Sequence, residues 1–354
     1  MGLSLEEFYK GRKVFVTGHT GFKGSWLCHL LLYLGAEVTG YATLPPTDPS
    51  IYELTGLSGR IHSVIGDVRD GEKLKNAMRE AEPEIVLHLA AQPIVRESYR
   101  VPRYTFETNV MGTVNVLECV RQLGCVRSVV NVTTDKVYEN KECSRGFRET
   151  DRLCGFDPYS NSKSCSELVT ASYKNAYFAD GATAVSTARA GNVIGGGDWA
   201  ADRLLPDCVR AALRHEPIVL RNPLSVRPFQ HVLEPLAAYL RIARAQFSDA
   251  SFADSYNVGP AETDCLTVGQ MTDLFCEAWG DGMTWRCEAE ENAVHEANFL
   301  RLDSTHIRER LGWTPVWDAP TAVRKTVEFT KCGLAGTDVR DTQERQIKEY
   351  FDVL

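Results

Sequence analysis

The sequence predicts an α/β protein built on a doubly wound parallel sheet. Short β-rich apolar runs alternate with helix-length amphipathic segments, and a glycine-rich loop follows the first of these runs. This alternation is typical of parallel strands with helices on both faces of a sheet. The expected strands are Lys13–Thr17, Glu37–Ala42, His62–Ile65, Ile85–Leu89, Ser128–Thr133 and Ala184–Ala188.

The fourth expected strand, Ile85–Leu89, is almost continuously apolar. Such a strand is expected in a sheet that is covered on both faces. Its one polar residue, His88, is therefore interpreted as a hydrogen-bonded core residue and not as a ligand.

A second, smaller C-terminal substrate-binding domain is predicted after Gly191, where glycine, proline and tryptophan become more frequent. Helices are still expected at Leu233–Phe247 and Leu266–Trp279, and a strand at Ser255–Val258 that returns to the first sheet. The predicted dinucleotide-binding domain therefore comprises residues 1–188 plus roughly 229–259. Residues 189–228 plus 260–354 form the predicted C-terminal substrate-binding domain, and the charged segment Asp338–Asp352 is expected to be a solvated helix.

The bulk composition narrows the classes of function. A net charge of -8 argues against a nucleic-acid partner, which requires clustered Lys and Arg. The 11 cysteines form no C-x-x-C pair and no Cys/His cluster, so we expect neither a disulfide framework nor a metal site. The most apolar stretch, Trp26–Leu34, is too short to span a membrane. Because the N-terminus also lacks the pattern of a secretion signal, we expect a cytoplasmic protein without a membrane partner.

A glycine-rich loop joins the first expected strand to the first helix. Its spacing is G-x-x-G-x-x-G, and the glycines let backbone N–H groups approach a pyrophosphate at a helix N-terminus. An ordinary glycine-rich turn is the alternative. The position at the first strand-helix junction of a doubly wound, Rossmann-type sheet favours a dinucleotide site. The candidate residues in the loop are Gly18, Thr20, Gly21, Phe22, Lys23 and Gly24.

The second expected strand lacks the acidic residue that commonly holds the adenosine ribose about 20 positions after such a loop. It ends in Thr39–Thr43 and offers only hydroxyl groups, and no arginine nearby suits a 2′-phosphate. This leaves the choice between NAD and NADP open at this stage. Asp67 and Val68, after the third strand, are candidates for the adenine end, and a simple turn aspartate is the alternative for Asp67.

Tyr159 and Lys163 stand four residues apart in a segment that Pro158 opens as a helix. An ammonium beside a phenol lowers its pKa from about 10, so the pair is suited to removing a hydroxyl proton during hydride transfer. Tyr9 and Lys13 match the same pattern, which shows that spacing alone is weak evidence. Only Tyr159 lies on a helix just after the strand whose end carries Thr134.

Thr134, Asp135 and Lys136 follow the strand Ser128–Thr133, at the sheet edge where ligands bind in open parallel sheets. Thr134 is expected to share the hydrogen bond of the reacting hydroxyl. In a continued strand Asp135 and Lys136 would face opposite sides, so a joint role requires the chain to turn there. An acid and a base at this point predict a dehydration in addition to oxidation. A surface ion pair is the alternative.

The chain resembles the extended short-chain dehydrogenase/reductases that act on nucleotide sugars. The resemblance covers nearly the whole chain. Dehydratases of this family for dTDP-glucose and GDP-mannose carry glutamate where this chain has Lys136, and the lysine resembles the branch that acts on CDP-glucose. The matching segments are the glycine loop through Trp26, Leu89–Gln92, Asn109, Thr133–Lys136, Pro158–Lys163, Gly197–Arg203 and Leu311–Pro315.

The resemblance implies bound NAD, regenerated in each turnover, and a CDP-glucose substrate. It implies that Thr134, Tyr159 and Lys163 serve oxidation at C4, that Asp135 is the acid toward the C6 hydroxyl, and that Lys136 is the base at C5. The product would be CDP-4-keto-6-deoxyglucose for deoxysugar synthesis, as in lipopolysaccharide O-antigen. Further implied cofactor residues are Leu89, Ala90, Ala91, Gln92, Asn109 and Thr133, and implied substrate residues are Asn192, Arg203, Arg221 and Arg227.

The resemblance also implies a homodimer or homotetramer, paired through helices near Thr105–Leu123 and Pro158–Phe178. Three other functions stay open: another nucleotide-sugar 4,6-dehydratase, a 4-epimerase of the same family, and a non-catalytic dinucleotide-sensing protein. An epimerase has no use for the pair Asp135 and Lys136, and a sensor has no use for Tyr159 and Lys163.

Overall fold

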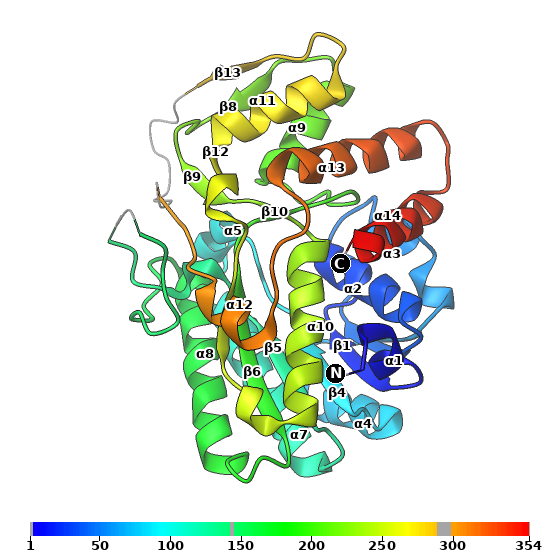
Figure 1. Ribbon diagram of the computed structural model, residues 1–354, viewed down its shortest axis with the longest axis vertical. Helices are drawn as coiled ribbons and strands as arrows, with labels where there is room; N and C mark the ends of the chain where they lie inside the picture. The colour runs from blue at the N-terminus through cyan, green and yellow to red at the C-terminus, as the bar shows by residue number, and fades with distance from the viewer. Residues whose placement is uncertain (1–2, 142–144, 289–298, 354) are drawn as a thin grey trace.

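A seven-stranded sheet forms the centre of the computed structural model, which describes residues 3–141, 145–288 and 299–353 (Figure 1). The strand order is β11-β6-β5-β4-β1-β2-β3, and all neighbouring strands run parallel. The predicted doubly wound parallel sheet is therefore confirmed. Its strands are β1 Lys13–Thr17, β2 Glu37–Ala42, β3 His62–Ile65, β4 Ile85–His88, β5 Ser128–Val132, β6 Ala184–Ala190 and β11 Ser255–Val258.

The six strands predicted in the first half all begin at the predicted residue. Their ends differ slightly, because β4 and β5 stop one residue earlier than expected and β6 continues to Ala190. Strand β11 pairs with β6 at the sheet edge, with Ser255 opposite Thr187. This confirms that the chain returns to the first sheet after an excursion.

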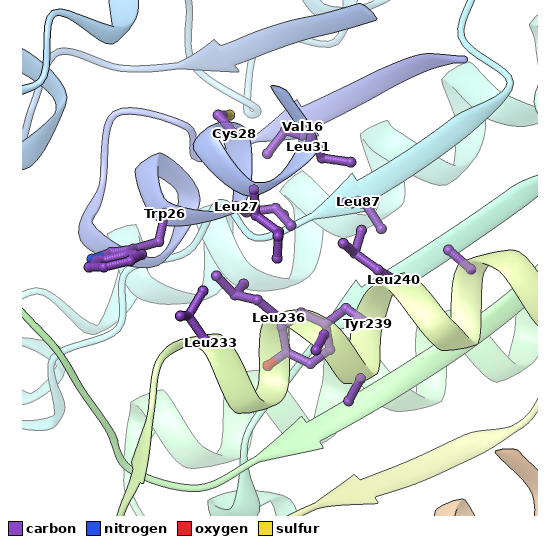
Figure 2. Close-up of a cluster of buried hydrophobic side chains, with 14 of the residues drawn as sticks. Val16, Trp26, Leu27, Cys28, Leu31, Leu87, Leu233, Leu236, Tyr239 and Leu240 are labelled. Atoms are coloured by element: carbon purple, nitrogen blue, oxygen red, sulfur yellow. The ribbon is translucent and has the colours of Figure 1, made fainter. Parts of the chain in front are cut away.

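Helices cover both faces of the sheet, as the continuously apolar strands require. Along β1, Val14 and Val16 face the core beneath α2 and α10, whereas Phe15 faces the core beneath α4 and α7. Figure 2 shows Val16 and Leu87 of the sheet beside apolar side chains of α2 and α10. The helices are α1 Leu5–Tyr9, α2 Phe22–Tyr33, α3 Ile51–Leu54, α4 Gly71–Ala81, α5 Val95–Arg100, α6 Pro102–Phe106, α7 Gly112–Leu123, α8 Pro158–Tyr177, α9 Leu204–Leu213, α10 Leu233–Ser248, α11 Val268–Trp279, α12 Thr305–Leu311, α13 Ala319–Leu334 and α14 Val339–Val353.

A second apolar core lies beyond the carboxyl end of the sheet, where α9, α11 and α13 pack together (top of Figure 1). The predicted helix Leu266–Trp279 begins two residues late, because Thr267 caps α11 and pairs with Val226 in a short ribbon. The strands of this region are β7 Val193–Ile194, β8 Ile218–Leu220, β9 Val226–Pro228, β10 Gln230–His231, β12 Cys265–Thr267 and β13 Trp285–Cys287.

The tail helix α14 differs from the solvated helix expected at 338–352. It is helical, but Ile347 and Tyr350 are buried, and the helix packs against α2. The predicted role of His88 is confirmed: its ring is buried and hydrogen-bonded to Thr17 at 2.7 Å and Thr113 at 3.2 Å. Across the described ranges, no helix is long and apolar enough to cross a membrane.

Candidate active site

A cavity of about 1230 Å³ opens where the carboxyl ends of β1, β4, β5 and β6 meet the second core. Ligands of open parallel sheets bind at this edge. The walls of the cavity come from both cores. The predicted residues that line it are Gly18, Thr20–Gly24, Asp67, Val68, Leu89–Ala91, Thr133–Lys136, Tyr159, Lys163, Asn192, Arg203, Arg221 and Arg227.

The glycine loop forms one wall of the cavity, between Thr17 at the end of β1 and Phe22 at the start of α2. Gly18 has a positive φ of 83°, and a Cβ there would lie 2.9 Å from the Ala90 nitrogen. A Cβ on Gly24 would lie 2.0 Å from the Gly18 oxygen. The loop therefore tolerates no side chain at these positions, and the positive end of α2 faces the cavity.

Hydroxyl groups and a paired carboxylate surround the far end of the loop. Thr20 donates its hydroxyl hydrogen to the Thr43 carbonyl at 3.0 Å. Asp67 accepts from the Arg69 backbone N–H at 2.9 Å and from its guanidinium at 2.7 Å. Asp67 therefore closes a local turn, as expected of a turn aspartate. It also lines the cavity, as expected of a residue at the adenine end. Burial acts to raise the pKa of Asp67, but the hydrogen bonds and charge of Arg69 together outweigh it and hold the pKa below its ordinary value.

Two predicted cofactor residues, Gln92 and Asn109, lie behind the cavity wall. The Asn109 amide joins both backbone groups of Gln92, at 2.8 and 3.1 Å, to the Ser162 hydroxyl of α8 at 2.9 Å. The Gln92 side chain donates to Thr105 at 2.9 Å. These two residues fix the segment after β4 against α8, and they are outside the set that lines the cavity.

The chain turns after β5, as a joint role of Asp135 and Lys136 requires. Residues Asp135–Val137 form a short 3₁₀ turn, and Thr134 caps it by accepting from the Lys136 N–H at 3.4 Å. The Thr134 hydroxyl donates to Asp135 Oδ1 at 3.0 Å. Lys136 Nζ lies 3.9 Å from the same oxygen. A carboxyl and an amine therefore stand side by side at the cavity wall.

Asp135 and Lys136 differ in exposure. Asp135 is only 1% exposed, and its Oδ2 has no hydrogen-bond partner among the described residues. A Cβ on Gly191 would lie 3.3 Å from this oxygen and 2.6 Å from the Pro228 side chain, so the close packing around Asp135 requires glycine there. Lys136 is 28% exposed and lines the cavity. An unpaired, buried carboxyl oxygen on a residue of the cavity wall is suited to exchange a proton with a ligand.

Tyr159 and Lys163 lie one turn apart on α8, which Asp157 caps through the Ser160 N–H at 2.9 Å. Lys163 Nζ donates to the Val132 carbonyl at 2.9 Å, which places the ammonium at the end of β5. Burial lowers the pKa of Lys163 to about 8. Burial raises the pKa of Tyr159 to about 12, although a hydrogen bond with Thr134 acts to lower it.

The similar pair Tyr9 and Lys13 has no such arrangement. The Tyr9 hydroxyl is buried and donates to the Leu240 carbonyl at 2.9 Å, whereas Lys13 pairs with Glu82 at 3.2 Å. The structure thus brings Thr134, Tyr159 and Lys163 together at the cavity. Tyr9 and Lys13, which match the same sequence pattern, have separate partners elsewhere.

Cationic side chains from the second core reach the opposite wall of the cavity. Arg227 lies on β9 and is largely buried. Arg203 pairs with Asp198 at 3.5 Å, and Arg221 pairs with Asp202 at 3.4 Å. Asn192 follows β6, and its side-chain oxygen is buried with no hydrogen-bond partner in the described part of the chain. These groups suit an anion or a polar ligand.

Sequence reasoning missed Arg96, which lines the cavity from the short helix α5 and lies 3.7 Å from Asp202. The segment 94–106 carries no strong periodic pattern, so no local signal marked it. Burial lowers the pKa of Lys23, in the glycine loop, to about 7, and the cations Arg203 and Lys163 act in the same direction. Arg96, Arg203 and Arg221 are each paired with a carboxylate that also lines the cavity.

The fold and this site define an extended short-chain dehydrogenase/reductase. The family model described as GDP-mannose 4,6 dehydratase matches residues 15–326, and the chain belongs to this family. The chain is 45% identical over 352 residues to CDP-glucose 4,6-dehydratase of Salmonella typhimurium, an alignment that covers 98% of each protein.

Solved structures show the same fold. UDP-glucose 4-epimerase of Thermus thermophilus in complex with NAD superposes with a TM-score of 0.76 at 26% identity, over 89% of this chain and 97% of that one. dTDP-glucose 4,6-dehydratase of Bacillus anthracis in complex with NAD gives 0.77 at 21% identity, over 92% and 99%. The fold is thus shared by epimerases and dehydratases, so the side chains in the cavity must decide between these activities.

Proposed function

We propose that the chain is an NAD-dependent CDP-glucose 4,6-dehydratase. The observation that carries this proposal is the adjacent carboxyl and amine of Asp135 and Lys136, which stand beside Thr134 in the cavity that Tyr159 and Lys163 line. The 45% identity to the Salmonella typhimurium CDP-glucose 4,6-dehydratase, over nearly the whole of both proteins, supports the same reading.

The glycine loop fits the diphosphate of NAD. Side chains are excluded at Gly18 and Gly24, and the α2 N-terminus faces the cavity. Val68, Leu89, Ala90 and Ala91 would hold the adenine and ribose side. When bound, NAD supplies a hydride acceptor for oxidation and a hydride donor for the final reduction.

Oxidation at C4 falls to α8 and the end of β5. Tyr159 takes the proton of the C4 hydroxyl as the hydride leaves that carbon, and Thr134 hydrogen-bonds the same oxygen. Burial raises the Tyr159 pKa, and the Thr134 hydrogen bond and the Arg203 charge oppose that rise. A Lys163 ammonium and the positive charge of oxidised nicotinamide would favour the phenolate in the same way. The product of this step is a ketone at C4.

Elimination of water falls to the turn after β5. The C4 ketone acidifies the neighbouring C5–H bond, and Lys136 takes that proton while Asp135 donates a proton to the departing C6 hydroxyl. The C6–O bond breaks, a C5–C6 double bond forms, and hydride returns to C6 with a proton at C5. The result is CDP-4-keto-6-deoxyglucose.

The substrate diphosphate is proposed to lie between the two cores. Arg227 would bind it through its planar fork of donors, with Arg203, Arg221 and Asn192 beside it. In this proposal residues 1–188 and roughly 229–259 hold the cofactor. Residues 189–228 and 260–354 hold the nucleotide sugar.

We also propose a cytoplasmic homodimer or homotetramer that pairs through α7 and α8. Exposed Met111, just before α7, and exposed Leu168 and Tyr177, on α8, support an apolar contact there. Light scattering coupled to size-exclusion chromatography measures the mass directly. A monomer at micromolar concentration would overturn this part of the proposal.

The purified chain is tested with NAD and the CDP-, dTDP-, GDP- and UDP-linked glucoses, and kcat/KM is measured for each. CDP-glucose is expected to be the preferred substrate and to yield a 4-keto-6-deoxy sugar. Preference for another nucleotide would overturn the assignment of substrate. Inversion at C4 without loss of water would overturn the dehydratase itself and indicate an epimerase.

A further inference from the structure

A buried ion pair lies directly behind the catalytic turn. Glu167 of α8 and Arg189 of β6 are 2.8 Å apart, and their side chains are 2% and 4% exposed. Burial of two charges costs about as much as their attraction returns, so such a pair seldom raises stability by itself. Neither residue lines the cavity, and neither takes part in the mechanism above.

The ion pair holds both ends of the turn that carries Asp135 and Lys136. The Thr133 hydroxyl, immediately before the turn, donates to Glu167. Arg189 donates to the hydroxyl of Tyr138, immediately after the turn, at 2.9 Å. The turn is thereby fastened to α8 through Glu167 at one end and to β6 through Arg189 at the other.

The ion pair also connects α8 and β6 to each other. The Thr187 hydroxyl of β6 donates to the second Glu167 oxygen at 2.7 Å, and Arg189 donates to the Glu149 carbonyl at 3.0 Å. The Glu167 carboxylate thus accepts from three side chains, those of Thr133, just past β5, and of Thr187 and Arg189 on β6. Arg189 Nε is the one buried donor of the pair without a partner among the described residues. A buried network of this kind favours one arrangement of the elements it joins.

The position of Glu167 on α8 relates it to the catalytic pair. Tyr159, Lys163 and Glu167 are each four residues apart, so they share one face of the helix. The negative charge of Glu167 raises the pKa of Lys163 and opposes the effect of burial. Burial lowers the pKa of Lys23 in α2 and of His88 in β4, and the charge of Lys163 acts in the same direction on both. The Asp135 carboxylate acts to raise the pKa of Lys23.

We propose that Glu167 is a positioning residue for the dehydration: it holds the turn with Asp135 and Lys136 in register with Tyr159, and it keeps the Lys163 ammonium charged. This inference rests on the proposed function. It assigns one carboxylate to two tasks, the placement of the acid and base and the charge state of the lysine.

The charge task is tested with Glu167→Gln. The pH dependence of Lys163 acetylation by acetic anhydride, followed by peptide mass spectrometry, reports the pKa of this lysine without any turnover. Loss of the anion lowers the pKa, so the acetylation midpoint is expected to fall by about one pH unit. Thr170→Val is the matched control. Thr170 lies on α8 like Glu167, is buried and accepts a hydrogen bond from Asn131 of β5, but it carries no charge. Equal midpoints in the wild type and Glu167→Gln would overturn the inference.

The placement task is tested with Glu167→Asp, which keeps the charge on a shorter side chain. We expect an unchanged acetylation midpoint, a kcat for CDP-glucose that falls by about 100-fold, and a KM that changes less. In Glu167→Gln the basic limb of the kcat profile should also move to lower pH. An unchanged kcat in Glu167→Asp would refute the placement task, even if Glu167→Gln did not fold. Absence of turnover by the wild type would refute the proposed function instead, because the acetylation midpoints decide the role of Glu167 independently.

Discussion

Glu234 offers a stability prediction whose size follows from the structure. It is fully buried in the first turn of α10 and accepts from the Trp317 N–H at 2.7 Å, the Val316 N–H at 3.1 Å and the Tyr350 hydroxyl at 2.8 Å. These contacts join α10 to the segment before α13 and to the tail helix α14. Glu234 therefore anchors the C-terminal elements to the sheet.

The stability from Glu234 depends on its proton. Burial raises the pKa of this carboxyl from 4.5 to about 7, although hydrogen bonds from Trp317, Tyr350 and Val316 act to lower it. The folded chain thus binds the proton more tightly than the unfolded chain. The contribution of protonated Glu234 to the free energy of unfolding is complete below the pKa that the carboxyl has in the unfolded chain. It declines as the pH rises and is lost above the pKa in the folded chain. At about 1.4 kcal/mol per pH unit, the loss is about 3 kcal/mol.

Glu234→Gln removes this titration, because an amide is neutral throughout the range. The free energy of unfolding is measured with urea at a series of pH values from below 4.5 to above 7. From the lowest to the highest pH, the free energy of unfolding of the variant should rise by about 3 kcal/mol relative to that of the wild type. Tyr350→Phe is the control, because it keeps the Glu234 carboxyl. The phenol hydrogen bond lowers the Glu234 pKa, so its loss should shift the pH-dependent decline in stability to higher pH. A difference between Glu234→Gln and the wild type that stays constant with pH would refute the reasoning.

Three further predictions concern the cavity. Lys136→Met should spare C4 oxidation, seen as trapped reduced cofactor, and slow product formation by about 100-fold or more; normal turnover would remove Lys136 from the mechanism. Arg227→Met should raise KM for CDP-glucose by about tenfold or more with a smaller change in kcat, and an unaltered KM would place the diphosphate elsewhere. Gly24→Ala should abolish NAD binding measured by calorimetry, since the new Cβ would lie 2.0 Å from the Gly18 oxygen; wild-type affinity would contradict this reading of the loop.

Local sequence patterns predict the sheet, and they place the two parts of the candidate site at the same sheet edge. Strand starts are readable because continuous apolar runs mark doubly covered strands, and the carboxyl ends of parallel strands meet at one edge. That rule places Thr134 near Gly18, although the two are far apart in sequence. The turn at Asp135, which the joint role required, is present.

Other features could not be read because they depend on contacts between distant segments. The tail helix α14 uses Gln343 and Gln346 as well as Ile347 on its buried face, so its charge pattern resembled that of a solvated helix. Glu167 and Arg189 look like ordinary polar positions until β6 and α8 are brought together. The sequence predicts Gln92 and Asn109 as cofactor residues, but the fold places both behind the wall of the cavity.

The central claim is that Asp135 and Lys136 make this chain a dehydratase. Its most direct test is the reaction of CDP-glucose with the wild-type chain in deuterated water, with the product analysed by NMR. The account predicts a 4-keto-6-deoxy sugar that carries deuterium at C5, because the C5 proton passes through Lys136 and exchanges with solvent. A sugar that is inverted at C4, keeps its C6 hydroxyl and carries no deuterium would contradict the claim.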